Sequence, residues 1–164
     1  MQRGYFFRHK YMLDKIPFTQ DGYDKIIAEH AELTNTKRQA AISRLARARA
    51  MGDLSENSEY QAAKEEHAFV EGRIKEIEEL MKRAEISSTQ STSGIDLGNT
   101  VIVEKDGVKS TYIIVGEFEA DPLEKKLSST SPIGKALLGR KVGDTVNVEV
   151  PAGTLKFKIL NINK

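Results

Sequence analysis

Hydrophobic residues in the first half of the chain recur at the three- and four-residue spacing of a helix face. The clearest run lies within 60–84, where the intervening positions are mostly Glu, Lys and Arg. Its apolar seam consists of Tyr60, Ala63, His67, Val70, Ile74, Ile77, Met81 and Ala84. This alternation predicts one helix of a coiled coil. A less regular seam within 20–51 predicts the partner helix, although Lys37 and Arg44 interrupt it.

A short turn around Gly52 separates the two helical patterns. Glycine suits the position just after a helix, where a left-handed backbone is needed. Helices joined by so short a turn must be antiparallel neighbours. About 30 residues per helix give a hairpin roughly 45 Å long. Such a hairpin is too thin to enclose a globular core, so we interpret it either as a device that reaches into a partner or as a spacer.

The pattern changes near Ile86, after which a small, polar stretch at 87–94 (SSTQSTSG) predicts a linker. Beyond it, β-branched runs alternate with glycines. They predict strands at 100–103, 110–115, 145–150 and 154–162. The pair Asp106-Gly107 predicts a tight hairpin turn between the first two strands.

One short helix is predicted at 132–138 in this second half. Ser131 is the expected N-cap, Pro132 the first helical residue and Gly139 the residue that ends the helix.

Together these patterns predict an α+β protein. Residues 14–86 form an N-terminal antiparallel α-helical coiled-coil hairpin domain, 87–94 a linker, and 95–164 an antiparallel β-sheet domain with one short helix. Residues 1–13 are basic and aromatic, and we expect this extension to be either disordered or an artefact of the gene model. In the second case Met12 is the true start and residues 1–11 are not translated.

Composition excludes several functional classes. The 164 residues include no Cys, which rules out disulfides, a thiolate zinc site and a cysteine nucleophile. No apolar run is long enough to span a bilayer or to form a signal peptide. The formal net charge is +1, without the concentrated basic face that duplex binding needs. We therefore expect a soluble, cytoplasmic protein without membrane association.

The second half shows no catalytic constellation, because it contains no His and no evident base for its Ser and Thr residues. This half is therefore predicted to be a docking domain rather than an enzyme.

The chemically informative residues lie at the predicted turn, where Asp53 and Glu56 are three positions apart. One interpretation is a capping box, in which Asp53 caps a backbone N–H and Glu56 reaches back. The other is that both carboxylates project from the end of the hairpin, since Ser55 can serve as the N-cap instead. Two carboxylates alone bind Mg²⁺ weakly, because this ion takes one or two carboxylates together with waters and substrate phosphates. The projecting arrangement would thus be a partial site that a partner completes.

The stretch ARAMGDLSENSEYQAAKEEHAFVEGRIKEIEELMKRAEI at 48–86 resembles the hairpin of the GreA/GreB family of bacterial transcript cleavage factors. The later segments GNTVIVE, TYIIVGEFEAD, SSTSPIGKALLGRKVGD and FKILNI match the second domain of that family in order. EYQAAKEE and FVEGRI, which follow the tip, are more similar to the GreA branch. Family members usually begin shortly before a pattern formed here by Pro17, Thr19 and Gly22, so residues 1–11 have no counterpart.

The resemblance implies a second domain that is similar in fold to FK506-binding proteins and docks on bacterial RNA polymerase at the rim of its secondary channel. It also implies that the coiled coil enters the channel. Asp53 and Glu56 match the tip carboxylates, which help to place a second Mg²⁺ and a water where the 3′ end of backtracked nascent RNA is cut. This Mg²⁺ is weakly bound and shared with the polymerase. The factor is then no enzyme by itself but a monomeric activator of transcription elongation.

Five further residues receive expected roles from this resemblance. Leu54, Ser55 and Asn57 complete the matching tip and are expected to position it. Arg44 and Arg47 lie one to two turns below the tip, where they can contact RNA. The alternative for these arginines is ion pairing with Glu59 and Glu66 on the other helix.

Other functions stay open beside this one. An inhibitor built on the same scaffold would occupy the channel without stimulating cleavage, but such relatives carry extra tip acids. A prolyl isomerase needs an aromatic-lined pocket, for which this half offers only Tyr112, Phe118 and Phe157. A plain coiled-coil scaffold and weak self-association are further alternatives.

Overall fold

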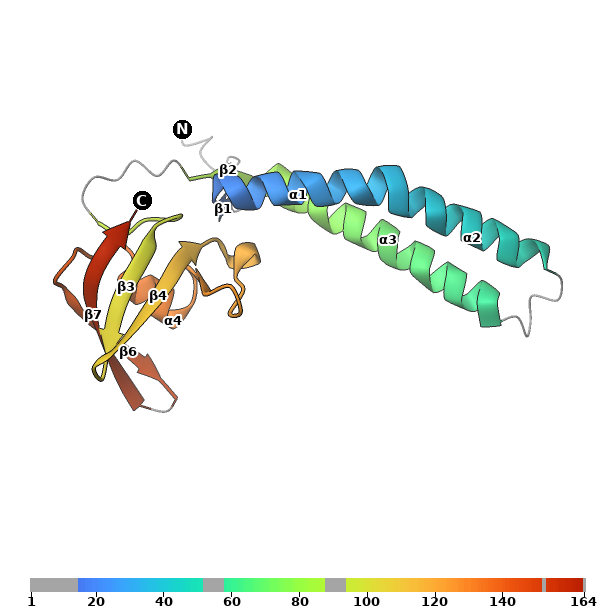
Figure 1. The fold of residues 1–164 in the computed structure, drawn as a ribbon. Coiled ribbons are helices and arrows are strands. Elements are labelled where there is room, and N and C mark those ends of the chain that lie inside the picture. The colour runs from blue at the N-terminus through green and yellow to red at the C-terminus, as the bar shows by residue number, and fades with distance from the viewer. Residues whose placement is uncertain (1–14, 52–57, 88–93, 152, 164) are drawn as a thin grey trace, which may run out of the picture. The chain divides into compact units, whose positions relative to one another are not determined.

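The computed structural model describes residues 15–51, 58–87, 94–151 and 153–163 (Figure 1). The chain divides into two compact units that interleave along the sequence. One unit contains Tyr23–Ala84. The other contains Lys15–Gly22 together with Glu85–Lys164, so the start of the first helix groups with the C-terminal part of the chain.

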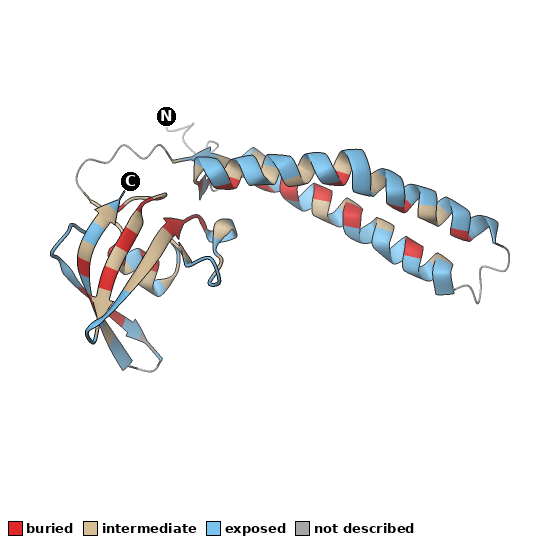
Figure 2. Cartoon of the chain, in the orientation of Figure 1, coloured by how far each residue is buried: buried red, intermediate tan, exposed pale blue. Residues whose placement is uncertain are grey.

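The N-terminal unit is a helical hairpin. Helix α1 (Gln20–Glu32) continues through a π-helical turn, η1 (Leu33–Lys37), into α2 (Arg38–Ala50), and α3 (Ser58–Arg83) returns alongside (Figure 1). Leu33, Val70, Ile74 and Ile77 form a buried cluster between the helices, with Ile26 and Met81 packed against it. Buried residues lie on the facing sides of the helices in Figure 2, as the predicted seam requires.

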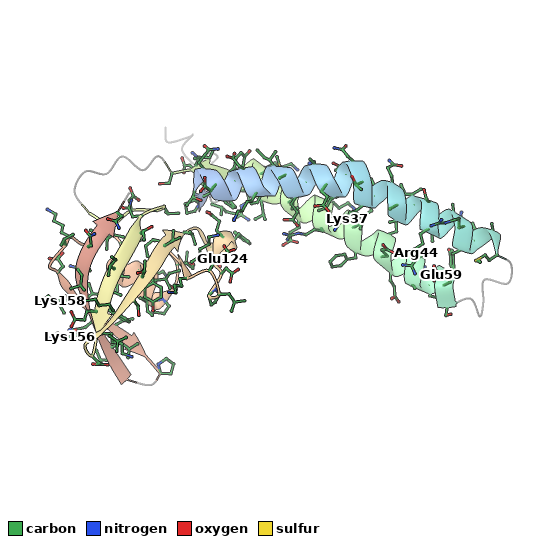
Figure 3. All side chains as sticks on the ribbon, in the orientation of Figure 1. Lys37, Arg44, Glu59, Glu124, Lys156 and Lys158 are labelled. Atoms are coloured by element: carbon green, nitrogen blue, oxygen red, sulfur yellow. The ribbon has the colours of Figure 1, made fainter. Side chains whose placement is uncertain are left out.

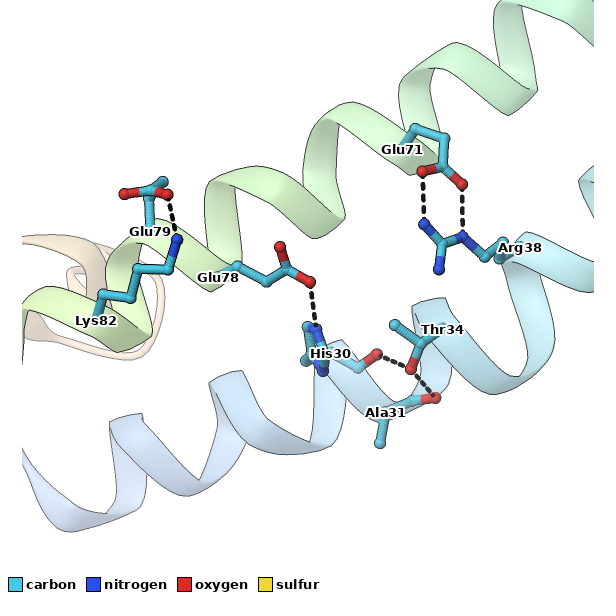
Figure 4. A network of polar contacts seen from close by, with 8 residues as sticks. All are labelled: His30, Ala31, Thr34, Arg38, Glu71, Glu78, Glu79 and Lys82. Carbon is cyan, nitrogen blue, oxygen red and sulfur yellow. Dashed lines mark hydrogen bonds and ion pairs between the residues drawn. The ribbon is translucent and has the colours of Figure 1, made fainter.

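The π-helical turn explains why the seam of the first helix is interrupted. A π turn holds one residue more than an α turn, so it shifts every later side chain around the helix. Without the shift, Lys37 and Arg44 would lie on the seam; with it, Ala41 and Ala48 are buried there. The Thr34 hydroxyl donates a hydrogen bond to the backbone oxygen of His30 at 2.7 Å, which satisfies an acceptor inside this widened turn (Figure 4).

The C-terminal unit is built on a five-stranded sheet with the order β5-β4-β3-β7-β6. The strands are β3 (Thr100–Lys105), β4 (Val108–Val115), β5 (Lys126–Ser128), β6 (Thr145–Val150) and β7 (Gly153–Asn163), and one short helix, α4 (Pro132–Leu137), belongs to the same unit. Its core consists of Ile95, Val101, Val103, Ile114, Leu137, Val146, Val148, Phe157 and Ile159. These findings confirm the predicted fold class, with the addition that the short edge strand β5 pairs parallel to β4.

Local turn signals also have the predicted geometry. Asp106 and Gly107 have φ values of 50° and 79°, as the tight hairpin between β3 and β4 requires. The Ser131 side chain accepts a hydrogen bond from the Gly134 N–H at 3.0 Å, which caps α4. Gly139 follows the helix with φ 74°.

A second, two-stranded sheet pairs β1 (Ile16–Phe18) with β2 (Ala84–Ile86). The helical pattern predicted Ala84 as a seam position, and this prediction is wrong, because α3 ends at Arg83. The backbone of the following residues bonds to a strand instead, and the Ser87 N–H donates to the Phe18 oxygen at 2.9 Å.

Within the C-terminal unit, the start of α1 is fastened to the turn that follows β4. Glu119 accepts a hydrogen bond from the Thr19 backbone N–H at 2.8 Å and another from the Thr19 hydroxyl. Thr19 in turn caps the helix by accepting from the Gly22 N–H at 3.0 Å. A Cβ on Gly22 would lie 2.0 Å from a carboxylate oxygen of Glu119, so any larger residue there would displace this side chain from Thr19. The spacing of Thr19 and Gly22 thus serves this joint.

Replacing Glu119 by alanine is expected to lower the free energy of unfolding by about 2 kcal/mol, the net cost of two lost hydrogen bonds to a carboxylate. The substitution removes the acceptor of both Thr19 hydrogen bonds. Urea unfolding followed by circular dichroism measures the change. Glu117→Ala, an exposed position in the same turn, serves as the control and should stay within about 0.5 kcal/mol of the original chain. Equal losses in the two variants would argue against the joint.

Candidate functional site

The predicted tip residues Asp53, Leu54, Ser55, Glu56 and Asn57 lie outside the described residues. The structure does describe the two helix ends that this segment joins. Helix α2 ends at Ala50, with Met51 as its C-cap, and α3 begins at Ser58. Both predicted carboxylates therefore belong to the connection between α2 and α3, while their roles stay predictions.

The helices that carry this connection are joined by small side chains. Ala41 and Ala48 of α2 and Ala63 of α3 are at most 1% exposed. Alanine at a helix–helix contact allows the two backbones to approach closely, since no larger side chain separates them. The part of the hairpin next to the tip is therefore slender, whereas the larger buried side chains Leu33, Val70, Ile74 and Ile77 lie further along it.

Arg44 lies between the two helices and contacts two carboxylates of α3. Its Nε and Nη2 donate to the two oxygens of Glu59 at 2.8 and 3.1 Å, and its Nη1 donates to Glu66. Figure 3 shows Arg44 and Glu59 directed toward each other from α2 and α3. The hydrogen bond from Arg44 lowers the pKa of Glu59. These ion pairs are the alternative that the sequence left open for Arg44.

For RNA contact, Arg44 would have to release these carboxylates. Arg47 is exposed on the same helix, where its positive charge also contributes to lowering the pKa of Glu59. A role of Arg44 and Arg47 in RNA contact stays a prediction.

Two further arginines connect the helices by bidentate pairs that the sequence pattern did not indicate. Arg38 donates to both oxygens of Glu71 at 2.5 and 2.6 Å (Figure 4). Arg73 donates to both oxygens of Glu29 at 2.7 and 3.0 Å. Bidentate guanidinium–carboxylate pairs fix geometry as well as charge, so they hold the two helices in register.

In the C-terminal unit, a tight turn at 121–126 presents Leu123, whose side chain is 94% exposed. The Leu123 N–H donates to the Asp121 carboxylate at 2.8 Å. The Lys126 backbone N–H donates to the backbone oxygen of Asp121 at 2.9 Å, which closes the turn. Single exposed apolar side chains are common on protein surfaces, so Leu123 is a candidate contact residue and its exposure alone assigns no site. Sequence reasoning missed it, although Leu123 is an apolar residue between turn-forming and charged neighbours.

A pocket of about 390 Å³ lies between the β3–β4 hairpin, α4 and β7. Its apolar lining comes from Val108, Tyr112, Ile133, Leu155 and Phe157. Two of these are aromatic, and Phe118, the third aromatic residue considered for an isomerase site, is not among the lining residues. The pocket thus provides little of the aromatic lining that a prolyl isomerase would need.

Within the described ranges, no group of three or more His, Asp or Glu residues is placed to hold a metal ion. Among the same residues, we find no helix with the length and apolar character needed to cross a membrane.

Comparison with known proteins covers both units. Residues 16–86 match the family described as "Transcription elongation factor, N-terminal", and residues 90–164 match "Transcription elongation factor, GreA/GreB, C-term". The chain is 46% identical over 157 residues to transcription elongation factor GreA of Thermoanaerobacter pseudethanolicus, an alignment that covers 93% of this chain and 100% of the relative. It is 49% identical over 150 residues to GreA of Listeria monocytogenes serotype 4a, with 89% and 94% coverage.

Among solved structures, the chain is similar to the GreA factor homolog 1 (Gfh1) protein of Thermus thermophilus. The sequence identity is 31% and the TM-score 0.43, and 92% of this chain and 99% of that chain are covered. Because both family matches and the GreA relatives extend over nearly the whole sequence, this chain belongs to the GreA/GreB family of transcription elongation factors.

Proposed function

We propose that the protein binds bacterial RNA polymerase in the cytoplasm, inserts its hairpin into the secondary channel and stimulates cleavage of backtracked nascent RNA. Cleavage creates a new RNA 3′ end in the polymerase site, so an arrested complex resumes elongation. The observation that carries this proposal is the family match over both units together with two carboxylates, Asp53 and Glu56, in the connection between α2 and α3.

The hairpin has the properties of a carrier for these carboxylates. Helix α3 has 26 residues, which corresponds to a length of about 39 Å. Alanines next to the tip keep the end slender, and the Arg38 and Arg73 pairs hold the helices in register. A slender, ordered rod suits entry into a narrow channel. A flexible segment of the same length would not hold its end at a fixed position.

The tip chemistry fits a shared Mg²⁺. Carboxylate oxygens are the ligands that Mg²⁺ prefers, and Asp53 and Glu56 would supply at most part of its coordination, with polymerase and RNA supplying the rest. An ion held there by Asp53 and Glu56 would supply charge stabilisation to the attacking and leaving oxygens of the cleaved phosphodiester. Leu54, Ser55 and Asn57 would hold the two carboxylates in place. The protein then acts as a monomeric activator and not as an enzyme in its own right.

The C-terminal unit would supply docking. Leu123 stands on the hydrogen-bonded 121–126 turn and is ready to be covered by a partner. Burying one leucine that the free protein leaves in water is favourable by roughly 2 kcal/mol, enough for an anchor residue.

A cleavage assay on backtracked polymerase tests the proposal. Adding the protein should shorten the RNA by cleavage near its 3′ end and allow the complex to resume elongation. The protein alone should leave free RNA intact in the presence of Mg²⁺. Failure to stimulate, or a decrease in the polymerase's own cleavage, would contradict the proposal and favour a channel-blocking inhibitor. Cutting of free RNA by the protein alone would contradict the shared site.

A further inference from the structure

Two neighbouring residues on the outer face of α3 conflict with the usual preferences of an exposed helix. Phe69 has a side chain that is 74% exposed. Gly72 is three positions further along, and residues at this spacing share a helix face. A Cβ added to Gly72 would have no atom of another described element within 4 Å, so the position faces open space. Glycine weakens an exposed helix relative to alanine. Neither residue is thus explained by the hairpin itself.

An exposed carboxylate lies on either side of these two residues along the helix. Glu65 precedes Phe69 by four positions and Glu76 follows Gly72 by four, so both lie on the same face and both are exposed. Arg73 donates to Glu76 at 2.9 Å but also bonds to both oxygens of Glu29 on α1. The charges nearest to the exposed ring are therefore the carboxylate of Glu65 and the mutually paired charges of Arg73 and Glu76, while the exposed Lys75 lies three positions beyond Gly72.

We propose that Phe69 and Gly72 form a contact surface for a basic side chain of the polymerase channel wall. The lysine or arginine would stack on the Phe69 ring, where the ring face attracts a cation. The bare Gly72 backbone would allow the partner to approach the helix closely, and Glu65 and Glu76 would flank the incoming positive charge. This inference rests on the proposed function, since it places α3 inside a protein channel.

Charge decides between possible occupants of this surface. RNA phosphates would be repelled by the exposed carboxylate of Glu65, four positions before Phe69. A second copy of the chain would present the same acidic surface, because a symmetric contact places identical patches against each other. The hairpin's own core lies on another face, since Val70, Ile74 and Ile77 are buried against the first helix. A basic protein partner is the occupant that complements both the ring and the acids.

Gly72→Ala gives the sharpest test, because its two expected effects have opposite signs. Alanine should raise the melting temperature of the protein by a few degrees, since it is the better helix former. In the same variant, polymerase affinity should fall about tenfold, because the added methyl group keeps the partner away from the helix. Lys64→Ala, an exposed position of α3 that is neither three nor four positions from Phe69 or Gly72, is the matched control and should change affinity less than about twofold.

Phe69 variants test the aromatic contact. Phe69→Tyr keeps the ring and should retain affinity within about threefold, whereas Phe69→Leu should lose about tenfold. All variants are titrated on polymerase elongation complexes beside the unmodified protein, whose stimulation of RNA cleavage is measured in the same samples. If the unmodified protein does not stimulate cleavage, the proposed function itself has failed.

If the unmodified protein stimulates cleavage but Gly72→Ala and Phe69→Leu bind equally well, only the contact surface is overturned. Sedimentation equilibrium tests whether a second copy of the chain occupies the surface instead. A dimer of the unmodified protein that dissociates in Phe69→Leu would assign the surface to a second copy and also overturn the proposal.

Discussion

Asp53→Asn and Glu56→Gln are each expected to reduce stimulated RNA cleavage about 100-fold while leaving polymerase affinity within about threefold of the unmodified protein. Each substitution keeps the size of the side chain but replaces a negatively charged oxygen, which Mg²⁺ prefers, by an amide nitrogen. Binding should persist because docking is assigned to the C-terminal unit. Cleavage rates at saturating factor, together with a binding titration, separate the two effects.

The control for the tip variants is Glu79→Gln, which makes the same chemical change on α3 at an exposed residue that pairs only weakly with Lys82. It should stimulate cleavage normally. The tip variants should in addition compete with the unmodified protein for the channel and so inhibit its activity. Full stimulation by both tip variants would show that the carboxylates have no chemical role and would favour the capping box.

Leu123→Asp is expected to weaken polymerase binding about 30-fold, which corresponds to about 2 kcal/mol lost at an anchor residue. Aspartate replaces an apolar contact by a charge that the partner would have to desolvate. The side chain is 94% exposed in the free protein, so the substitution should leave the fold and its melting temperature unchanged. Affinity is measured by titration on elongation complexes, with thermal melting of the same samples.

Val142→Asp provides the comparison for Leu123, because Val142 is an exposed apolar residue of the same unit outside the 121–126 turn. It should bind polymerase with nearly the original affinity. At saturating concentration, Leu123→Asp should still stimulate cleavage, since its tip is unchanged. Equal binding by both variants would remove Leu123 from the docking surface.

Elements governed by local sequence could be predicted. The seam residues Ala63, Val70, Ile74 and Ile77 are buried as their spacing indicates. Asp106-Gly107 forms the hairpin turn, and Ser131 caps α4. In each case, the residues that decide the structure are a few positions apart, so their pattern is visible in the chain.

Features that depend on distant partners were not visible. The Glu119–Thr19 joint connects residues 100 positions apart, and the Arg38–Glu71 pair connects residues 33 positions apart. The π-helical turn at 33–37 follows from matching two seams, so it depends on α3 as well as on its own residues. For the candidate site, the motif placed Asp53 and Glu56 between α2 and α3, but it could not indicate Leu123 or the engagement of Arg44 by two carboxylates.

The Mg²⁺ dependence of cleavage tests most directly whether the tip completes an ion site in the polymerase. Backtracked complexes are incubated with saturating factor, either unmodified or Glu56→Gln, over a range of Mg²⁺ concentrations. We expect the unmodified protein to lower the Mg²⁺ concentration at half-maximal cleavage about tenfold relative to Glu56→Gln. The same Mg²⁺ dependence with both proteins would contradict the account, because the tip would then contribute no ligand to the metal.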